Sequence, residues 1–276
     1  MTAPVRFRFT LSRLLAAIFF SYLALAAGMY LFQRSFMYFP DPSPALAADY
    51  QLEGFTTTTL TAADGTALTA WIHKAKEGMQ TIVYFHGNAG HLGYRAEKFR
   101  SFAAAGFGLV AVSYRGYGGS EGSPSQPGLY SDAAAALTYA REVLKIPEHS
   151  LILYGESLGT GIATYLATKH PDIALLVLEA PYRSVEARAK EIYPYLPVRY
   201  LIKDRYPLVA LLPAVNAPVL IFHGTEDVIV PFAHGQAVYA AASDPKRFVV
   251  FEGKGHTNFD SARLVEEISQ SLILSD

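Results

Sequence analysis

The chain has 276 residues, of which 51% are hydrophobic, so it can bury a sizeable core, and we interpret it as one large domain. Its formal net charge is −1 and its basic residues form no cluster, which argues against a nucleic-acid partner. The absence of cysteine excludes a disulfide framework, a thiolate nucleophile, thiolate zinc ligands and palmitoylation of the chain itself.

An uncharged apolar run extends from Leu14 to Phe32 near the N-terminus. At 1.5 Å per residue, a helix of this length spans about 29 Å, close to the roughly 30 Å of the hydrocarbon core of a bilayer. We therefore predict a single transmembrane anchor at residues 14–32.

The charges on the two sides of this run differ. Three arginines precede it, namely Arg6, Arg8 and Arg13, whereas only Arg34 follows closely. The positive-inside rule therefore predicts a cytoplasmic segment at residues 1–13 and places the main domain on the opposite, periplasmic or extracytoplasmic side. The alternative is a secreted protein with a cleaved signal peptide, because Ala24-Leu25-Ala26 fits an A-x-A site. The apolar run continues beyond these alanines, which favours the anchor.

Prolines follow the anchor in the run Asp41-Pro42-Ser43-Pro44, and they favour an extended backbone. We predict a linker at residues 33–49 and the main domain at residues 50–276.

The main domain begins with two strand-like segments, Phe55–Thr61 and Leu68–His73, around an Asp64-Gly65 turn that is typical of an antiparallel hairpin. Further apolar runs predict strands at 82–85, 109–114, 151–154, 175–178, 219–222 and 248–251. Helical patterns alternate with them near 92–105, 129–144, 158–169, 233–242 and 261–274. Such alternation predicts an α/β fold with a mostly parallel sheet covered by helices on both faces.

Residues 181–213 interrupt this alternation and are rich in tyrosine, leucine and proline. We interpret them as a small lid inserted between two strands. Ordinary packing over the sheet edge is the alternative, since aromatic side chains are usually core residues.

The strongest local motif is Gly155-Glu156-Ser157-Leu158-Gly159, directly after a predicted strand. This G-x-S-x-G pattern is the sequence form of a nucleophile elbow, in which a serine occupies a strained turn between strand and helix. Glycines at the flanking positions remove Cβ atoms that would clash there. Ser157 is therefore the candidate nucleophile, and a buried serine at a helix start is the alternative.

Candidate partners of Ser157 follow other predicted strands, where ligands collect in a parallel sheet. Asp227 and His256 appear after Ser157 in the order serine, acid, histidine that an elbow of this kind requires. His256 is the candidate general base, and Asp227 would orient its ring. Glu226 is adjacent and has the same charge, so it stays open as the acid.

A glycine-bearing loop, His86-Gly87-Asn88-Ala89-Gly90, follows the strand predicted at 82–85. We expect the backbone N–H groups of Asn88 and Leu158 to form an oxyanion hole, to which the side chain of Asn88 would contribute little. In the glycine-rich turn at 113–122 we expect Arg115 to hold the loop architecture, with Glu121 as its ion partner.

Three segments together, Phe85–Gly90, Ser113–Gly122 and Tyr154–Gly159, resemble the α/β-hydrolase superfamily. Within it, they resemble the small membrane-anchored serine hydrolases related to protein depalmitoylases. The resemblance covers most of residues 54–271 and implies an α/β-hydrolase fold. It also favours Asp227 over Glu226 as the acid and assigns His86 to the oxyanion loop.

These patterns predict acyl transfer to water through an acyl-enzyme on Ser157, with carboxylic esters or thioesters of apolar, lipid-like acyl groups as substrates. A serine peptidase or amidase with the same triad is one alternative, and a membrane-tethered, non-enzymatic binding protein is another. The run Gly159–Thr164, with Glu179 further along, is a partial dinucleotide fingerprint and a weaker alternative. Neither H-E-x-x-H nor G-x-x-x-x-G-K-[ST] occurs, so we expect no metal and no cofactor.

Overall fold

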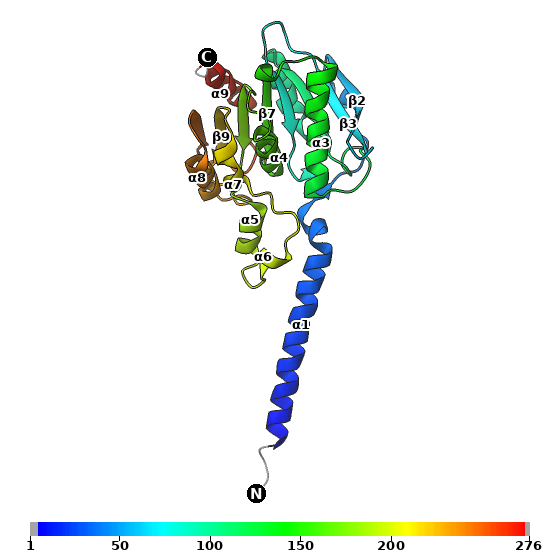
Figure 1. The fold of residues 1–276 in the computed structure, drawn as a ribbon, viewed down its shortest axis with the longest axis vertical. Coiled ribbons are helices and arrows are strands. Elements are labelled where there is room, and N and C mark those ends of the chain that lie inside the picture. Colours follow the sequence, from blue (N-terminus) through cyan, green and yellow to red (C-terminus); the bar gives the residue numbers. More distant parts are fainter. Residues whose placement is uncertain (1–4, 274–276) are drawn as a thin grey trace.

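The computed structural model describes residues 5–273. The first four residues of the predicted segment 1–13 and the last three of the predicted domain 50–276 lie outside this range. A long helix, α1 (Val5–Met37), projects from a globular α/β body, and the C-terminal turns of α1 meet that body (Figure 1).

The core of the body is an eight-stranded sheet in the order β10-β9-β8-β7-β4-β6-β3-β2. The strands are β2 (Phe55–Thr61), β3 (Ala67–His73), β4 (Thr81–Phe85), β6 (Gly108–Val112), β7 (Leu151–Glu156), β8 (Leu175–Glu179), β9 (Val219–Gly224) and β10 (Lys246–Phe251). β3 pairs antiparallel with both β2 and β6, and the remaining pairs are parallel. The mostly parallel sheet and the antiparallel hairpin are therefore confirmed.

Helices cover both faces of the sheet. The main ones are α2 (Ala96–Ala104), α3 (Gln126–Thr138), α4 (Leu158–Ala167), α8 (Phe232–Ala241) and α9 (Ser261–Ile273). Short helical turns lie at η1 (Ala47–Tyr50), η2 (Leu92–Arg95), η3 (Tyr139–Val143), η4 (Glu148–Ser150) and η5 (Leu212–Ala214). Side chains alternate along each strand, so Val83 of β4 joins the core under α3, α4 and α8, whereas Ile82 joins the core under α2 and α9.

α1 contains the predicted anchor and continues five residues beyond its predicted end at Phe32. Its segment Thr10–Met37 is long and apolar enough to cross a membrane, and most of it stands clear of the body (Figure 1). A signal sequence near an N-terminus would pass the same test of length and composition.

Residues 38–49, which belong to the predicted linker 33–49, are packed against the body. Tyr38, Ala45 and Ala47 are buried, and Trp71 donates a hydrogen bond to the carbonyl of Ala45 at 2.9 Å. The short strand β1 (Phe39–Pro40) pairs in parallel with β5 (Ala89–Gly90). Extended, proline-containing backbone is compatible with such packing, because its apolar side chains still gain from burial.

The segment predicted as a lid, residues 181–213, forms three short helices, α5 (Val185–Ile192), α6 (Val198–Leu201) and α7 (Leu208–Leu211). α5 and α6 protrude from the body on the side where α1 arrives (Figure 1). α6 contacts α1, so the N-terminal helix and this segment, hereafter the lid, lie next to each other.

Candidate active site

Ser157 lies at the junction of β7 and α4, with φ 50° and ψ −113°. A non-glycine residue rarely adopts such a positive φ, and the strain persists because the surroundings are tightly packed. A Cβ at Gly155 would overlap the backbone of Gly159, and a Cβ at Gly159 would overlap the carbonyl of Phe85. The local geometry is that of a nucleophile elbow, as the motif predicts.

The side chains of Ser157, His256 and Asp227 form one hydrogen-bonded chain. His256 Nε2 lies 2.8 Å from Ser157 Oγ, and His256 Nδ1 lies 2.7 Å from Asp227 Oδ2. The backbone N–H groups of Ile229 and Val230 donate to Asp227 Oδ1 at 2.9 and 2.8 Å. Ser157 and His256 are 99 positions apart along the chain, and Asp227 and His256 are 29 apart. The ends of the parallel strands bring the three side chains together.

Asp227, rather than Glu226, is the carboxylate that faces His256. The side chain of Asp227 is buried, whereas Glu226 is exposed. Burial by itself would raise the pKa of Asp227, but hydrogen bonding to His223 and His256 outweighs it and holds the pKa below its usual range. Asp227 is therefore ionised at neutral pH.

The two backbone N–H groups expected to form an oxyanion hole come from different elements. Leu158 is the first residue of α4, where N–H groups have no partner within the helix, and Asn88 lies between β4 and β5. The Asn88 carbonyl accepts hydrogen bonds from the N–H of Phe39 and the hydroxyl of Tyr117, both at 2.9 Å. These bonds fix the orientation of the loop.

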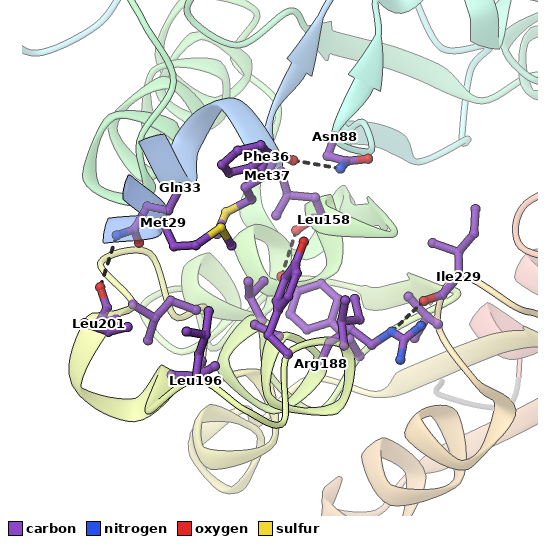
Figure 2. Close-up of a pocket in the computed structure, with 18 of the residues that line it drawn as sticks. Met29, Gln33, Phe36, Met37, Asn88, Leu158, Arg188, Leu196, Leu201 and Ile229 are labelled. Atoms are coloured by element: carbon purple, nitrogen blue, oxygen red, sulfur yellow. Dashed lines mark hydrogen bonds between the residues drawn. The ribbon is translucent and has the colours of Figure 1, made fainter. Parts of the chain in front are cut away.

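The side chain of Asn88 has a role that the sequence reasoning missed. Its Nδ2 donates to the carbonyl of Met37, the last residue of α1, at 2.8 Å (Figure 2). Asn88 therefore joins the loop after β4 to the end of the N-terminal helix. No sequence signal indicated this contact, because the two residues are 51 positions apart.

A cavity of about 260 Å³ reaches Ser157 and Leu158. Its walls are mostly apolar and come from α1, from the lid and from the loop after β9, as Figure 2 shows. The lid thus does more than pack on the sheet, because Tyr182, Leu196 and Leu201 line this cavity. An apolar chain held here would have one end at Ser157.

The chain is similar to known proteins in sequence and in fold. The model of a family described as Serine aminopeptidase, S33 (Hydrolase_4) matches residues 76–208. The chain is 35% identical over 239 residues to the uncharacterized protein Rv2307c of Mycobacterium tuberculosis, covering 84% of this chain and 85% of that protein. It is 32% identical over 196 residues to the lysophosphatidylserine lipase ABHD12 of Danio rerio, covering 64% of this chain and 51% of that protein.

Among solved structures, the esterase Pf2001 of Pyrococcus furiosus matches with a TM-score of 0.66 at 16% identity, covering 86% of this chain and 97% of that chain. The chain belongs to the α/β-hydrolase superfamily. It is a hydrolase, so the non-enzymatic alternative is set aside.

Beneath the elbow of this α/β-hydrolase lies a buried group of four charged side chains that the sequence reasoning missed. Glu156 Oε1 pairs with Arg95 Nη2 at 2.7 Å, Glu156 Oε2 pairs with Lys98 Nζ at 2.9 Å, and Lys98 also pairs with Glu179 Oε2 at 2.5 Å. The register of β7 against β8 places Glu156 beside Glu179, which is the signal that could have revealed the pair.

The electrostatics of this group follow from burial and pairing. Burial would raise the pKa of Glu156, but Arg95 and Lys98 outweigh it and hold that pKa well below its usual range. Burial raises the pKa of Glu179, which shares Lys98 with Glu156. The four groups pair two carboxylates with two cations.

Arg115 holds its loop as expected, but with different partners. Arg115 Nη2 pairs with the buried Asp132 at 2.7 Å, and Arg115 Nη1 pairs with Asp64 at 2.8 Å. Glu121, expected to be the ion partner, instead accepts a hydrogen bond from the N–H of Ala67 at 3.2 Å. Asp132 is the partner because α3 packs beside the turn and places this carboxylate against the side chain and the backbone N–H of Arg115.

The partial dinucleotide fingerprint in this α/β-hydrolase has a packing explanation. A Cβ at Gly159 would overlap the end of β4, and a Cβ at Gly161 would overlap the hydroxyl of Tyr182. Glu179 is fully buried and bonded to Lys98 and Tyr154, so it has no access to a ribose. The glycines allow α4 to approach its neighbours closely.

Proposed function

We propose that this α/β-hydrolase cleaves carboxylic esters or thioesters with an apolar acyl group, through an acyl-enzyme on Ser157. The observation that carries the proposal is the contact between Ser157 Oγ and His256 Nε2 at 2.8 Å, at the end of an apolar cavity. A serine hydroxyl needs an adjacent base to attack a carbonyl at neutral pH.

The proposed reaction has two halves, acylation of Ser157 and hydrolysis of the acyl-enzyme. His256 takes the proton of Ser157 as Oγ attacks the carbonyl carbon, and Asp227 stabilises the imidazolium that forms. The N–H groups of Asn88 and Leu158 stabilise the negative oxygen of the tetrahedral intermediate. His256 then protonates the leaving alcohol or thiol, which leaves the acyl group on Ser157. A water molecule next attacks this acyl group and gives a proton to His256. His256 returns that proton to Ser157 Oγ as the carboxylic acid leaves.

The cavity supports an acyl group as the part of the substrate that is bound. Its walls are mostly apolar, and mostly apolar clefts with a few polar groups are typical ligand sites. The named activity of the ABHD12 relative, a lipase, agrees with an ester substrate. The family description as an aminopeptidase favours the second candidate, a peptidase or amidase that uses the same three side chains.

We also propose that α1 is a retained membrane anchor, with its N-terminus cytoplasmic and the catalytic domain on the other side. Tyr22 supports retention, because its hydroxyl donates to the carbonyl of Tyr195 in the lid at 3.0 Å. A signal peptidase acting after Ala26 would remove Tyr22. N-terminal sequencing of the mature protein tests this, and a start at residue 27 would establish the secreted alternative.

The activity is tested with the full chain in detergent micelles. A fluorophosphonate probe is expected to label the wild type and not Ser157→Ala, because it reacts with activated serines. Turnover is then compared between p-nitrophenyl esters and aminoacyl amides. Absence of labelling in the folded wild type would refute the serine hydrolase, and hydrolysis of amides alone would establish the peptidase or amidase.

A further inference from the structure

One face of α1 forms part of the cavity that reaches Ser157. Met29, Gln33, Phe36 and Met37 all line it. They recur at intervals of four, three and one residues, which places them on the same side of an α-helix. Figure 2 shows these four side chains on one side of the cavity and Leu196 and Leu201 of the lid on another.

Polar contacts fasten the lid to the same helix. Gln33 donates from Nε2 to the carbonyl of Leu201 at 3.0 Å and accepts at Oε1 from the N–H of Lys203 at 2.7 Å. Arg34 Nε donates to Asp204 Oδ2 at 2.8 Å. These bonds hold the two walls at a set separation, so the width of the cavity depends on α1 as much as on the lid.

The mouth of the cavity is bordered by exposed apolar side chains. Phe36 and Ile192, which line the cavity, are 54% and 50% exposed, and the adjacent lid tip exposes Tyr195 and Tyr200 at 59% and 79%. Large apolar side chains that are exposed together near a cavity are typical of a contact with a membrane or another protein. Here it adjoins a helix of membrane-spanning length.

The depth of the mouth follows from the position of α1. Met29 lies within the predicted span 14–32, and Phe36 lies about 6 Å beyond Phe32 at 1.5 Å per residue. The headgroup layer on each side of a bilayer is roughly 5–8 Å thick. The cavity wall from Met29 to Phe36 therefore spans the level where acyl chains meet headgroups. The lid tip reaches deeper among the acyl chains, because Tyr195 accepts a hydrogen bond from Tyr22, which lies within the predicted span.

We infer that the acyl-binding site is a composite of α1 and the lid, and that it takes a single acyl chain directly from the bilayer. This inference rests on the proposed function. The cavity of about 260 Å³ is small for a ligand site, which suits one chain rather than two. α1 is then a determinant of acyl-chain specificity in addition to an anchor.

The first test narrows the cavity from α1. In the full chain in micelles, kcat/KM is measured for p-nitrophenyl dodecanoate and p-nitrophenyl acetate, and their ratio is compared between variants. Met29→Trp is expected to lower the ratio about tenfold or more, because overpacking a filled site is costly. Leu31→Trp is the matched control: Leu31 is 66% exposed, on the same helix outside the cavity lining, and the ratio is expected to stay at the wild-type value.

The outcomes separate the two proposals. An unchanged ratio in Met29→Trp, with normal probe labelling at Ser157, would overturn the composite site and leave the proposed function standing. Absence of probe labelling and of p-nitrophenyl acetate turnover in the folded wild type would instead refute the proposed function. A ratio is used because it cancels differences in the amount of active enzyme.

The second test addresses the route of entry. The protein is reconstituted in phosphatidylcholine vesicles that contain a fluorogenic monoacyl ester, and the mole fraction of the ester in the bilayer is varied at constant bulk concentration. Entry from the bilayer predicts a rate that follows the mole fraction. A rate that follows only the bulk concentration would overturn entry from the bilayer.

Discussion

Arg95 donates two hydrogen bonds to Glu156 Oε1, from Nε at 3.0 Å and from Nη2 at 2.7 Å, and its Nη1 donates to the carbonyl of Ala89 at 2.8 Å. Glu156 immediately precedes Ser157, and Ala89 immediately follows Asn88. One guanidinium group therefore joins the two loops that carry the proposed oxyanion amides. A lysine could not make these contacts in the same way, because only the planar guanidinium of arginine presents several N–H donors in fixed directions.

Replacement of Arg95 by methionine is expected to lower kcat by about tenfold to a hundredfold with a smaller change in KM, because a misplaced amide weakens stabilisation of the transition state. Steady-state kinetics on a p-nitrophenyl ester measure this, at a temperature where circular dichroism shows folded protein. Arg100→Met is the control: Arg100 is exposed on α2, the helix that directly follows Arg95, and this variant should match the wild type. A proportional rise in KM with an unchanged kcat would contradict the positioning role.

Replacement of Asp227 by asparagine is expected to lower kcat by about 10³–10⁴-fold, because an amide cannot hold the imidazole in the required tautomer or stabilise its cation. Glu226→Gln removes a neighbouring carboxylate whose side chain is exposed, and it should leave kcat unchanged. Equal effects of the two changes would contradict the contact between Asp227 and His256 as the catalytic one.

Replacement of Arg115 by methionine is expected to destabilise the fold by about 3–5 kcal/mol, because it leaves the buried carboxylate of Asp132 without its cation. Burial raises the pKa of Asp132 even with the arginine present, which shows how unfavourable its ionised form is there. Glu121→Gln should change the free energy of unfolding by less than about 0.5 kcal/mol. Thermal unfolding followed by circular dichroism distinguishes the two.

The buried side chain of His86 is expected to make the free energy of unfolding depend on pH in the acid range. Burial, with a smaller effect of Arg95, lowers the pKa of His86 from 6.5 to about 3 in the folded protein. Between these values the unfolded chain binds a proton that the folded chain does not, so the free energy of unfolding falls as the pH falls from 6.5. Between pH 6.5 and about pH 4.5, the free energy of unfolding of His86→Gln should fall by about 2 kcal/mol less than that of the wild type. Urea unfolding at a series of pH values measures this difference. The same dependence of the free energy of unfolding on pH in the two proteins would contradict a lowered pKa for His86.

Much of the fold and of the site was predictable because the signals are local. Each of the strands β4 and β6 to β10 contains an apolar run of four residues. The elbow needs its two glycines within a stretch of five residues. Asp227 and His256 could be chosen because parallel strands end at one edge of the sheet. The choice of Asp227 over Glu226, however, came from a family resemblance, and only the structure shows which one faces His256.

The contacts that escaped prediction join residues far apart in the chain. The bonds from Gln33 to Leu201 and from Asn88 to Met37 link segments whose own patterns indicate a membrane helix, a lid and a loop, and no pattern within a segment encodes its partner. The pairing of Arg115 with Asp132 rather than Glu121 has the same origin. Short-range reasoning favours the nearer carboxylate, whereas packing of α3 determines the true one.

The pairing of β1 with β5 bears on how a water-soluble version of this enzyme would be engineered. Trimming the chain at Tyr50, the predicted start of the domain, would remove Phe39 and Pro40 and strip the loop after β4 of its only neighbouring strand among the described residues. The sheet could then fold while the amide of Asn88 lost its alignment. Polar substitutions on the outward side of the helix, at residues 10–28, keep this pairing and are the safer route to crystals.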